Sequence, residues 1–217
     1  MILGARWLSD ELHWPASYEG TDESAEMAAI TGGAALAEVG PFDELLLRGP
    51  GALDVLGSLA TDPRAAMPGR VVAVALGGER WATWILERDE ILLLSPSGGS
   101  ILTTRGEDLV ADQTSVLEMS GARTALRLVG PHAPRILVEV CPDDTTPATM
   151  QQGTVIQAPL AGVRALIARE DCLGSPGYTI LIARDEAAYT WESLRAIGTF
   201  HGLIPVGPTA VAAEDGA

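Results

Sequence analysis

The side chains able to act as nucleophiles, bases or metal ligands are few and lie far apart in this chain of 217 residues. The three histidines are His13, His132 and His201, and none has a serine or cysteine nucleophile and an acid at motif spacing. No pair of them has the spacing of metal ligands. Two cysteines, Cys141 and Cys172, make neither a disulfide framework nor a metal cluster. The sequence therefore predicts no catalytic residue and no metal site.

The composition excludes several classes of function. All fourteen cations are arginines, so neither a Schiff base on lysine nor the lysine of a phosphate loop can occur. The net charge of −15 argues against nucleic acid as a partner, because phosphate binding depends on clustered cations. Before residue 45, nine acids stand against the single cation Arg6. We interpret this acidic lead segment as a solvated strip, with a docking surface for a basic partner as the alternative.

Two tryptophans and four acids stand on or beside predicted strands. Trp81 and Trp84 are three residues apart, so they point to opposite faces of a sheet, one into the core and the other toward a channel or an interface. The acids are candidates for acid or base roles if the chain is an enzyme: Glu79, Glu87, Glu170 and Asp171. The run Ser97-Gly98-Gly99-Ser100 lacks a cation and a following helix, which indicates a hairpin tip rather than a phosphate loop.

A repeated unit of strand, Gly-Pro corner and helix must position these residues. The first copy covers 45–59 with its corner at Gly49-Pro50, and the second covers 125–139 with its corner at Gly130-Pro131. Proline suits the first helical turn, and the preceding glycine permits the sharp entry. One such unit cannot bury its own apolar face, so two copies predict one duplicated α+β body made of ferredoxin-like halves.

The remaining elements follow from apolar periodicity and turn signals. Helices are predicted over 22–32 and 185–198, and strands over 34–39, 70–76, 81–87, 91–95, 154–158, 162–169 and 178–183. Over 106–120, a helix or a loop is expected to lead into the run Val116-Leu117-Glu118-Met119.

We expect a single domain over 1–207, with halves at about 34–110 and 111–207, and a flexible tail over 208–217. No stretch is long enough to span a bilayer, and the N-terminal residues turn acidic too early for a signal peptide. These features predict a cytoplasmic protein without a membrane partner.

The order of the motifs resembles the glycine-cleavage T-protein (aminomethyltransferase) superfamily over nearly the whole chain. The motifs that carry the resemblance are Leu36 to Leu45 followed by Arg48-Gly49-Pro50, then Pro68-Gly69-Arg70, Gly174 to Ile180, Trp191 to Leu194 and Gly202 to Gly207. The resemblance implies a folate-binding-type domain without the β-barrel domain into which full-length members continue. A stand-alone domain of this length resembles the gamma subunit of heterotetrameric sarcosine oxidase, the assembly partner of a flavin-bearing subunit.

The resemblance also implies which residues face tetrahydrofolate. The acidic pair of catalytic members falls on Ala82 and Thr83, the usual asparagine on Ser95, and the folate-clasping glutamate on Ser175. The arginine expected after the last glycine-rich turn has no counterpart in 210–213. The residues assigned to a tetrahydrofolate site are Trp84, Glu87, Ser95, Ser175 and Tyr178. Among them, the tryptophan could stack a pterin or anchor a partner subunit.

Two functional hypotheses follow. The first is a non-catalytic gamma-type subunit of a sarcosine oxidase-like complex, an amine oxidase or demethylase, which docks onto flavin-dependent oxidase subunits and shapes a tetrahydrofolate site. The alternative is a stand-alone, shortened aminomethyltransferase-like enzyme that binds folate or another small molecule in the same channel. One-carbon transfer to tetrahydrofolate needs a carboxylate beside the reacting nitrogen, and its replacement here favours the first hypothesis.

Overall fold

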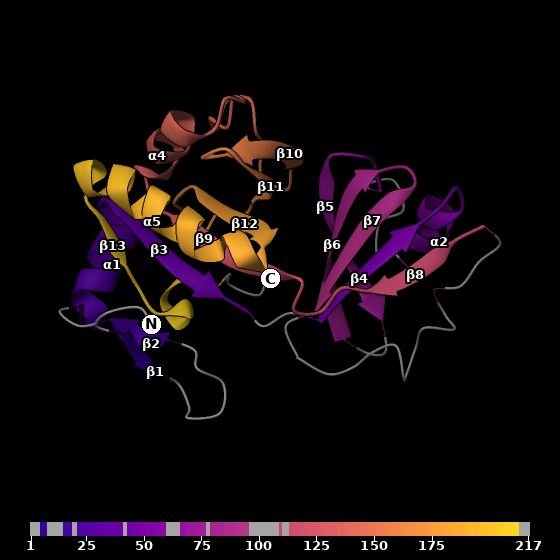
Figure 1. Cartoon of the computed structure of the whole chain (residues 1–217), viewed down its shortest axis with the longest axis horizontal. Helices are drawn as coiled ribbons and strands as arrows, with labels where there is room; N and C mark the ends of the chain where they lie inside the picture. Colours follow the sequence, from indigo (N-terminus) through magenta and orange to yellow (C-terminus); the bar gives the residue numbers. More distant parts are fainter. Residues whose placement is uncertain are drawn as a thin grey trace. The chain divides into compact units, whose positions relative to one another are not determined.

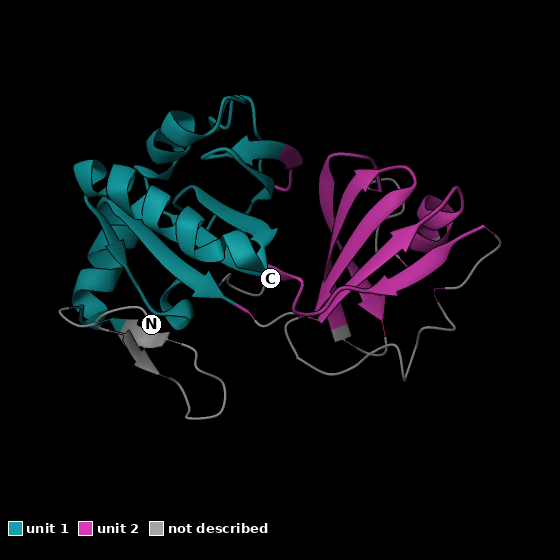
Figure 2. Cartoon of the chain, in the orientation of Figure 1, with its two compact units in different colours: residues 1–39, 124–152, 158–217 teal, residues 40–123, 153–157 magenta. Residues whose placement is uncertain are grey.

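A computed structural model describes residues 5–7, 15–18, 21–40, 43–59, 66–76, 79–95, 109 and 113–212. The chain divides into two compact units (Figure 2). Unit 1 consists of Met1–Val39, Thr124–Gln152 and Ala158–Ala217, and unit 2 of Gly40–Arg123 and Gly153–Gln157. None of the described helices has the length and apolarity needed to cross a bilayer.

Unit 2 contains a five-stranded antiparallel sheet (Figure 1). Its elements are β4 (Asp43–Arg48), α2 (Ala52–Leu59), β5 (Arg70–Leu76), β6 (Glu79–Glu87), β7 (Glu90–Ser95) and β8 (Ser115–Glu118). The strands lie in the order β5-β6-β7-β4-β8. Alternate residues of these strands pack with α2 into one core cluster, whose largest members include Leu45, Leu47, Leu56, Trp81, Ile85 and Leu93.

Unit 1 contains a six-stranded sheet in the order β10-β11-β12-β9-β3-β13 and a two-stranded β1-β2 sheet. Its strands are β1 (Ala5–Trp7), β2 (Pro15–Tyr18), β3 (Ala34–Val39), β9 (Arg123–Val129), β10 (Val155–Leu160), β11 (Val163–Arg169), β12 (Gly177–Ala183) and β13 (Leu203–Pro205). Its helices are α1 (Glu23–Gly32), α4 (Ala133–Val140) and α5 (Ala187–Gly198), with short 3-10 turns η3 (Arg184–Glu186), η4 (Thr199–His201) and η5 (Pro208–Val211). The last strand, β13, pairs in parallel with β3.

The predicted α+β class and the duplication are confirmed. The succession β4-α2-β5-β6-β7 forms a sheet in the order β5-β6-β7-β4, and β9-α4-β10-β11-β12 repeats it as β10-β11-β12-β9. Both Gly-Pro corners have the same conformation, with φ of +132° at Gly49 and +126° at Gly130. A Cβ atom would lie 2.0 Å from the carbonyl oxygen of Gln113 at the first corner and 2.5 Å from that of Gly33 at the second. Only glycine fits either corner.

The structure adds to the sequence-based expectations in three places. Residues 115–118 form the edge strand β8, in the run that the sequence left without an assigned element. The segment 34–39, which the repeat assigns to the first half, belongs to unit 1, and the single-domain organisation stays a prediction. Residues 208–211 form the 3-10 turn η5, whose Val211 is fully buried in a cluster with α1 and β3, and the flexible tail over 208–217 stays a prediction.

Some predicted features lie outside the described residues. These are His13, the run Ser97-Gly98-Gly99-Ser100 and the side chain of Glu79.

Candidate functional site

The predicted site residues of unit 1 lie on the β11–β12 hairpin. Cys172 and Ser175 exchange two main-chain hydrogen bonds of 3.0 and 2.9 Å, which close a two-residue turn. Leu173 in that turn has φ of +50°, as hairpin turns matching the twist of their strands require. Tyr178 lies on β12 directly opposite Arg169 of β11. The hairpin therefore gives Ser175, which is 8% exposed, and Tyr178 fixed positions on one element.

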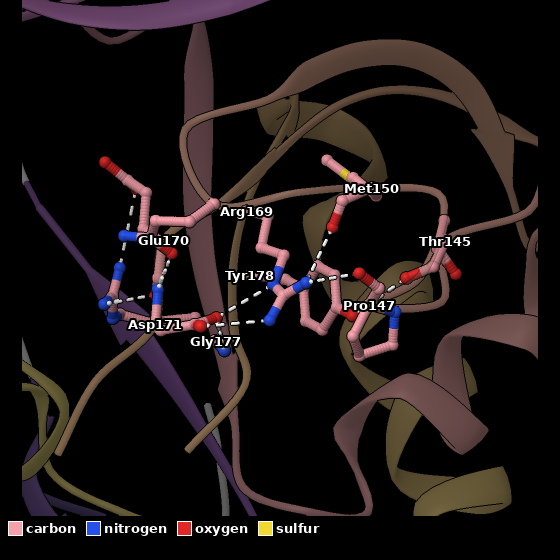
Figure 3. A network of polar contacts seen from close by, with 10 residues as sticks. Thr145, Pro147, Met150, Arg169, Glu170, Asp171, Gly177 and Tyr178 are labelled. Carbon is pink, nitrogen blue, oxygen red and sulfur yellow. Dashed lines mark hydrogen bonds and ion pairs between the residues drawn. The ribbon is translucent and has the colours of Figure 1, made fainter. Parts of the chain in front are cut away.

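Arg169 is the centre of a polar network beside this turn (Figure 3). Its Nε and Nη2 donate to the two carboxylate oxygens of Asp171, at 2.9 and 3.0 Å. Its Nη1 donates to the main-chain carbonyls of Pro147 and Met150, at 3.0 and 2.8 Å. A bidentate guanidinium–carboxylate pair is among the stronger and more directional polar contacts. The network ties the loop 141–153 to the hairpin.

Tyr178 belongs to the same network. It is fully buried, and its hydroxyl donates to the main-chain carbonyl of Thr145 at 2.8 Å. Burial raises the pKa of Tyr178 to about 12, and the charge of Arg169 offsets part of this effect. In the same loop, the carboxylate of Asp144 accepts hydrogen bonds that hold its pKa below the usual range, and the bond from Thr149 contributes most. The phenol of Tyr178 is therefore neutral at ordinary pH, and its proton lies in the hydrogen bond to the carbonyl of Thr145.

A second arginine holds Glu170, the residue that follows the last residue of β11. Arg127 is 5% exposed, and it donates from Nη1 to the hydroxyl of Thr179 at 2.8 Å and from Nη2 to the carbonyl of Glu170 at 3.0 Å. The hydroxyl of Thr179 in turn donates to the Glu170 carboxylate at 2.5 Å, and that carboxylate lies 3.6 Å from Arg127 Nη1. Both acids that sequence places at this turn are thus engaged, Glu170 here and Asp171 by Arg169.

In unit 2, the predicted site residues do not converge on one face of the sheet. Trp81 belongs to the core cluster with α2, and Trp84 points to the opposite face, which confirms the predicted alternation. Ser95 is fully buried and shares the core face with Leu93, so it points away from Trp84. Glu87 is exposed at the end of β6. A pocket on a single face of this sheet cannot use both Trp84 and Ser95.

A buried ion pair lies on the same sheet face as Trp84. Glu44 is 4% exposed and forms an ion pair with Arg123, whose pKa burial lowers. The main-chain N–H of Glu44 donates to the hydroxyl of Ser120 at 3.0 Å. Glu44 of β4 lies opposite Leu94 of β7, and Leu94 lies opposite Ala82 of β6. Ala82 and Trp84 are two residues apart on β6, so Glu44 shares a sheet face with Trp84. The expectation of a solvated acidic lead segment is therefore wrong for Glu44, because a cation from far along the chain neutralises it.

The described histidines contact other groups of the chain, and both cysteines are buried. His201 Nε2 lies 2.6 Å from the carboxylate of Glu139, and His132 Nδ1 lies 2.8 Å from the carbonyl oxygen of His201. Cys141 and Cys172 are free and buried, as expected, and burial raises the pKa of Cys141. Within the described ranges, no three His, Cys, Asp or Glu side chains gather closely enough to hold a metal ion. The two histidines join α4 to η4.

The described residues do not fit a folate site that grips its ligand through a carboxylate. The positions of the family's acidic pair hold Ala82, a methyl group, and Thr83, whose hydroxyl is buried on the core face. The hydroxyl of Tyr178 is already bonded to the loop. The indole N–H of Trp84 is buried and makes no hydrogen bond within the described part of the chain. One donor on that face is thus without a partner among the described residues, and the carboxylate on the same face, that of Glu44, is paired with Arg123.

Sequence reasoning did not find the arginines that organise these surroundings. Arg169 had one usable signal, because it ends an apolar strand two residues before Asp171, and an i, i+2 pair on an extended chain points to one side. The Arg123–Glu44 pair had no local signal, since its members come from strands far apart in sequence.

Known proteins share both the sequence pattern and the fold. The family model of the GCVT N-terminal domain matches residues 4–214. An aminomethyltransferase from Halothermothrix orenii is 28% identical over 217 aligned residues, which cover 94% of this chain and 59% of that protein. The sarcosine oxidase subunit gamma from Corynebacterium sp. strain P-1 is 31% identical over 112 residues, 52% of this chain and 55% of that protein. The chain thus spans a little over half the length of these relatives.

Two solved structures extend the comparison. The glycine cleavage system aminomethyltransferase T from Bartonella henselae matches with a TM-score of 0.77 at 18% identity, over 95% of this chain and 57% of that chain. A chain of the heterotetrameric sarcosine oxidase from Corynebacterium sp. U-96, in complex with pyrrole 2-carboxylate, matches with a TM-score of 0.64 at 26% identity, over 89% of this chain and 95% of that chain. The resemblance expected from the motifs is confirmed: the chain belongs to the GCVT N-terminal domain family and resembles the gamma subunit of sarcosine oxidase.

Proposed function

We propose that the chain is a non-catalytic, gamma-type subunit of a sarcosine oxidase-like complex, in which it docks onto a flavin-dependent oxidase subunit. The observation that carries this proposal is the likeness to the heterotetrameric sarcosine oxidase, which runs at 26% identity through 95% of the matched chain. The likeness to a sarcosine oxidase subunit gamma adds support at the level of sequence.

The surroundings of the acids support a role without chemistry. Glu170 is bonded to Thr179, and Asp171 is held at both oxygens by Arg169. Glu44 is paired with Arg123. A general base must be able to accept a proton from a ligand, and each of these carboxylates would first have to give up a partner.

The direct test is purification of the affinity-tagged chain from its native host under mild conditions. We expect a flavoprotein to elute with it in a fixed ratio, to be identified by its visible flavin absorbance and by mass spectrometry, and to oxidise sarcosine or a related secondary amine. Elution of the chain free of any flavoprotein, in extracts where the oxidase activity is present, would contradict the proposal.

A second candidate function, a folate-binding aminomethyltransferase-like protein, is supported by the buried indole N–H of Trp84, which has no hydrogen-bond partner among the described residues. Of the residues assigned from sequence (Trp84, Glu87, Ser95, Ser175 and Tyr178), this proposal keeps Trp84 as the ligand residue, because Ser95 points to the opposite face of the same sheet. Titration of the isolated chain with 5-formyltetrahydrofolate tests it. Micromolar binding that Trp84→Phe weakens and Trp81→Phe leaves unchanged would count against a purely structural role.

A further inference from the structure

Strand β8 of unit 2 is the counterpart of strand β3 of unit 1. Each of them directly precedes one copy of the repeat and pairs, antiparallel, with the first strand of the other copy, β8 with β4 and β3 with β9. The corner glycine of each copy approaches the carbonyl of a residue just before that strand, which is Gln113 for β8 and Gly33 for β3. Three residues further along, Val116 of β8 therefore corresponds to Leu36 of β3.

The outer edges of these two strands differ. Beside β3, the strand β13 pairs in parallel, and the main-chain N–H of Val206 donates to the carbonyl of Leu36 at 2.9 Å. Strand β8 is the last strand of its own sheet (Figure 1). Within the described part of the chain, no segment takes beside β8 the place that β13 takes beside β3.

The register shows which main-chain groups of β8 face outward. The N–H of Met119 donates to the carbonyl of Glu44 at 2.7 Å, so every second residue from Met119 back along β8 points its N–H and C=O toward β4. Val116 points both groups the other way, as Leu36 points its carbonyl toward Val206. Neither group of Val116 has a hydrogen-bond partner among the described residues. Such an edge is a template for a further strand.

The side chains of β8 are exposed where those of β3 are buried. Leu117 is 43% exposed, whereas its counterpart Ala37 is fully buried in one cluster with Val206. Ser115 is exposed as well, and its counterpart Ala35 belongs to that same cluster. An apolar side chain at the place equivalent to Val206 would remove Leu117 from water, which favours an apolar strand as the partner of this edge.

We propose that the outer edge of β8 binds an extended apolar segment of the subunit onto which the chain docks, running parallel to β8 as β13 runs beside β3. This inference rests on the proposed function and names the element that docks. In strand addition, main-chain hydrogen bonds supply affinity and alternate side chains supply specificity. A second copy of the chain fits this edge less well, because identical edges related by a two-fold axis pair antiparallel and because each copy carries a net charge of −15.

The test compares Val116→Pro with its matched control, Val116→Ala. Proline removes the outward N–H, and at this position it costs no hydrogen bond to β4. Alanine keeps the N–H and gives up the packing of Val116 against the core of unit 2. Each tagged chain is expressed in the native host and checked for folding by circular dichroism. Its dissociation constant is measured for the purified flavoprotein that elutes with the wild type, and light scattering reports the mass of each free chain.

Hydrogen exchange of the wild-type chain, free and in the complex, reports on β8 without any substitution. We expect exchange at the amide of Val116 to slow at least about tenfold in the complex. We also expect Val116→Pro to bind about tenfold more weakly than the wild type and Val116→Ala to bind like it.

Unchanged exchange in β8 on complex formation would overturn the assigned edge and leave the proposed function intact. Equal binding by Val116→Pro and the wild type would do the same, and so would an equal loss in Val116→Pro and Val116→Ala. If the wild-type chain brings down no flavoprotein, the proposed function fails and this occupant fails with it. A wild-type dimer whose formation slows exchange in β8 would identify a second copy as the occupant and overturn the proposal.

Discussion

Substitution of Arg169 by alanine tests whether the hairpin network determines the stability of unit 1. The change removes four hydrogen bonds, two to the Asp171 carboxylate and two to main-chain carbonyls of the loop 141–153. Removing one member of a buried ion pair costs about 3–5 kcal/mol, since the partner charge stays buried. The side chain of Asp171 is 34% exposed, so water replaces part of what it loses. We therefore expect a loss of about 2–3 kcal/mol in the free energy of unfolding.

Urea denaturation followed by circular dichroism measures this loss, and hydrogen exchange shows where it falls. We expect faster exchange in the loop 141–153 and in the hairpin, because Arg169 joins the two. The variant Arg169→Lys keeps the charge without the bidentate geometry and should recover less than half of the lost stability. Arg164→Ala, at an exposed position of the same strand, is the control and should change stability by less than about 0.5 kcal/mol. A loss below about 1 kcal/mol for Arg169→Ala, or full recovery by lysine, would refute the reasoning.

Three further substitutions have expected outcomes in the same urea assay. Gly130→Ala should cost more than about 2 kcal/mol, because φ is +126° and the new Cβ would lie 2.5 Å from the carbonyl oxygen of Gly33. Arg123→Met should cost about 3 kcal/mol by leaving Glu44 buried without its cation. Tyr178→Phe should cost about 1 kcal/mol for its hydrogen bond. The pKa of Tyr178 is about 12 in the folded state and about 10 in the unfolded state. The neutral phenol therefore stabilises the wild type fully below pH 10, and this stabilisation is lost as the pH rises through 12. The Tyr178→Phe variant should lack this loss of stability at high pH.

Each of these substitutions has a control in the same chain. Gly162→Ala places a methyl group in open space at φ of +87° and should cost only about 1 kcal/mol. Adding Glu44→Gln to Arg123→Met removes the uncompensated charge and should restore part of the stability. Tyr189→Phe removes an exposed phenol that bonds a surface carbonyl and should cost less than Tyr178→Phe.

The parts of the fold that local chemistry dictates were predictable from the sequence. The Gly-Pro corners at Gly49 and Gly130 predict two strand-to-helix turns. Only glycine allows the backbone to come so close to a neighbouring carbonyl, and proline favours the first turn of a helix. Strands β8 and β13 were missed for a physical reason. Most of β8 is exposed and shows no apolar alternation, and β13 is a three-residue strand that ends in proline and pairs in parallel with the distant β3.

The candidate site was less predictable, because its geometry depends on long-range partners. Alternation along β6 correctly separated Trp81 from Trp84. Nothing in the sequence shows that Ser95 turns toward the core, since its face is fixed by pairing with β4. The partners of Arg169 include carbonyls of a loop that precedes it, and hydrogen bonds to main-chain carbonyls leave no trace in side-chain patterns.

The two copies of the repeat suggest how this family scaffold would serve the assembly proposed above. In a binding enzyme, acids at a ligand site must be free to exchange partners, whereas Glu170, Asp171 and Glu44 are all engaged by hydroxyl or guanidinium groups of the chain itself. The same pairing rigidifies each unit, and a rigid unit loses little entropy when another subunit binds it.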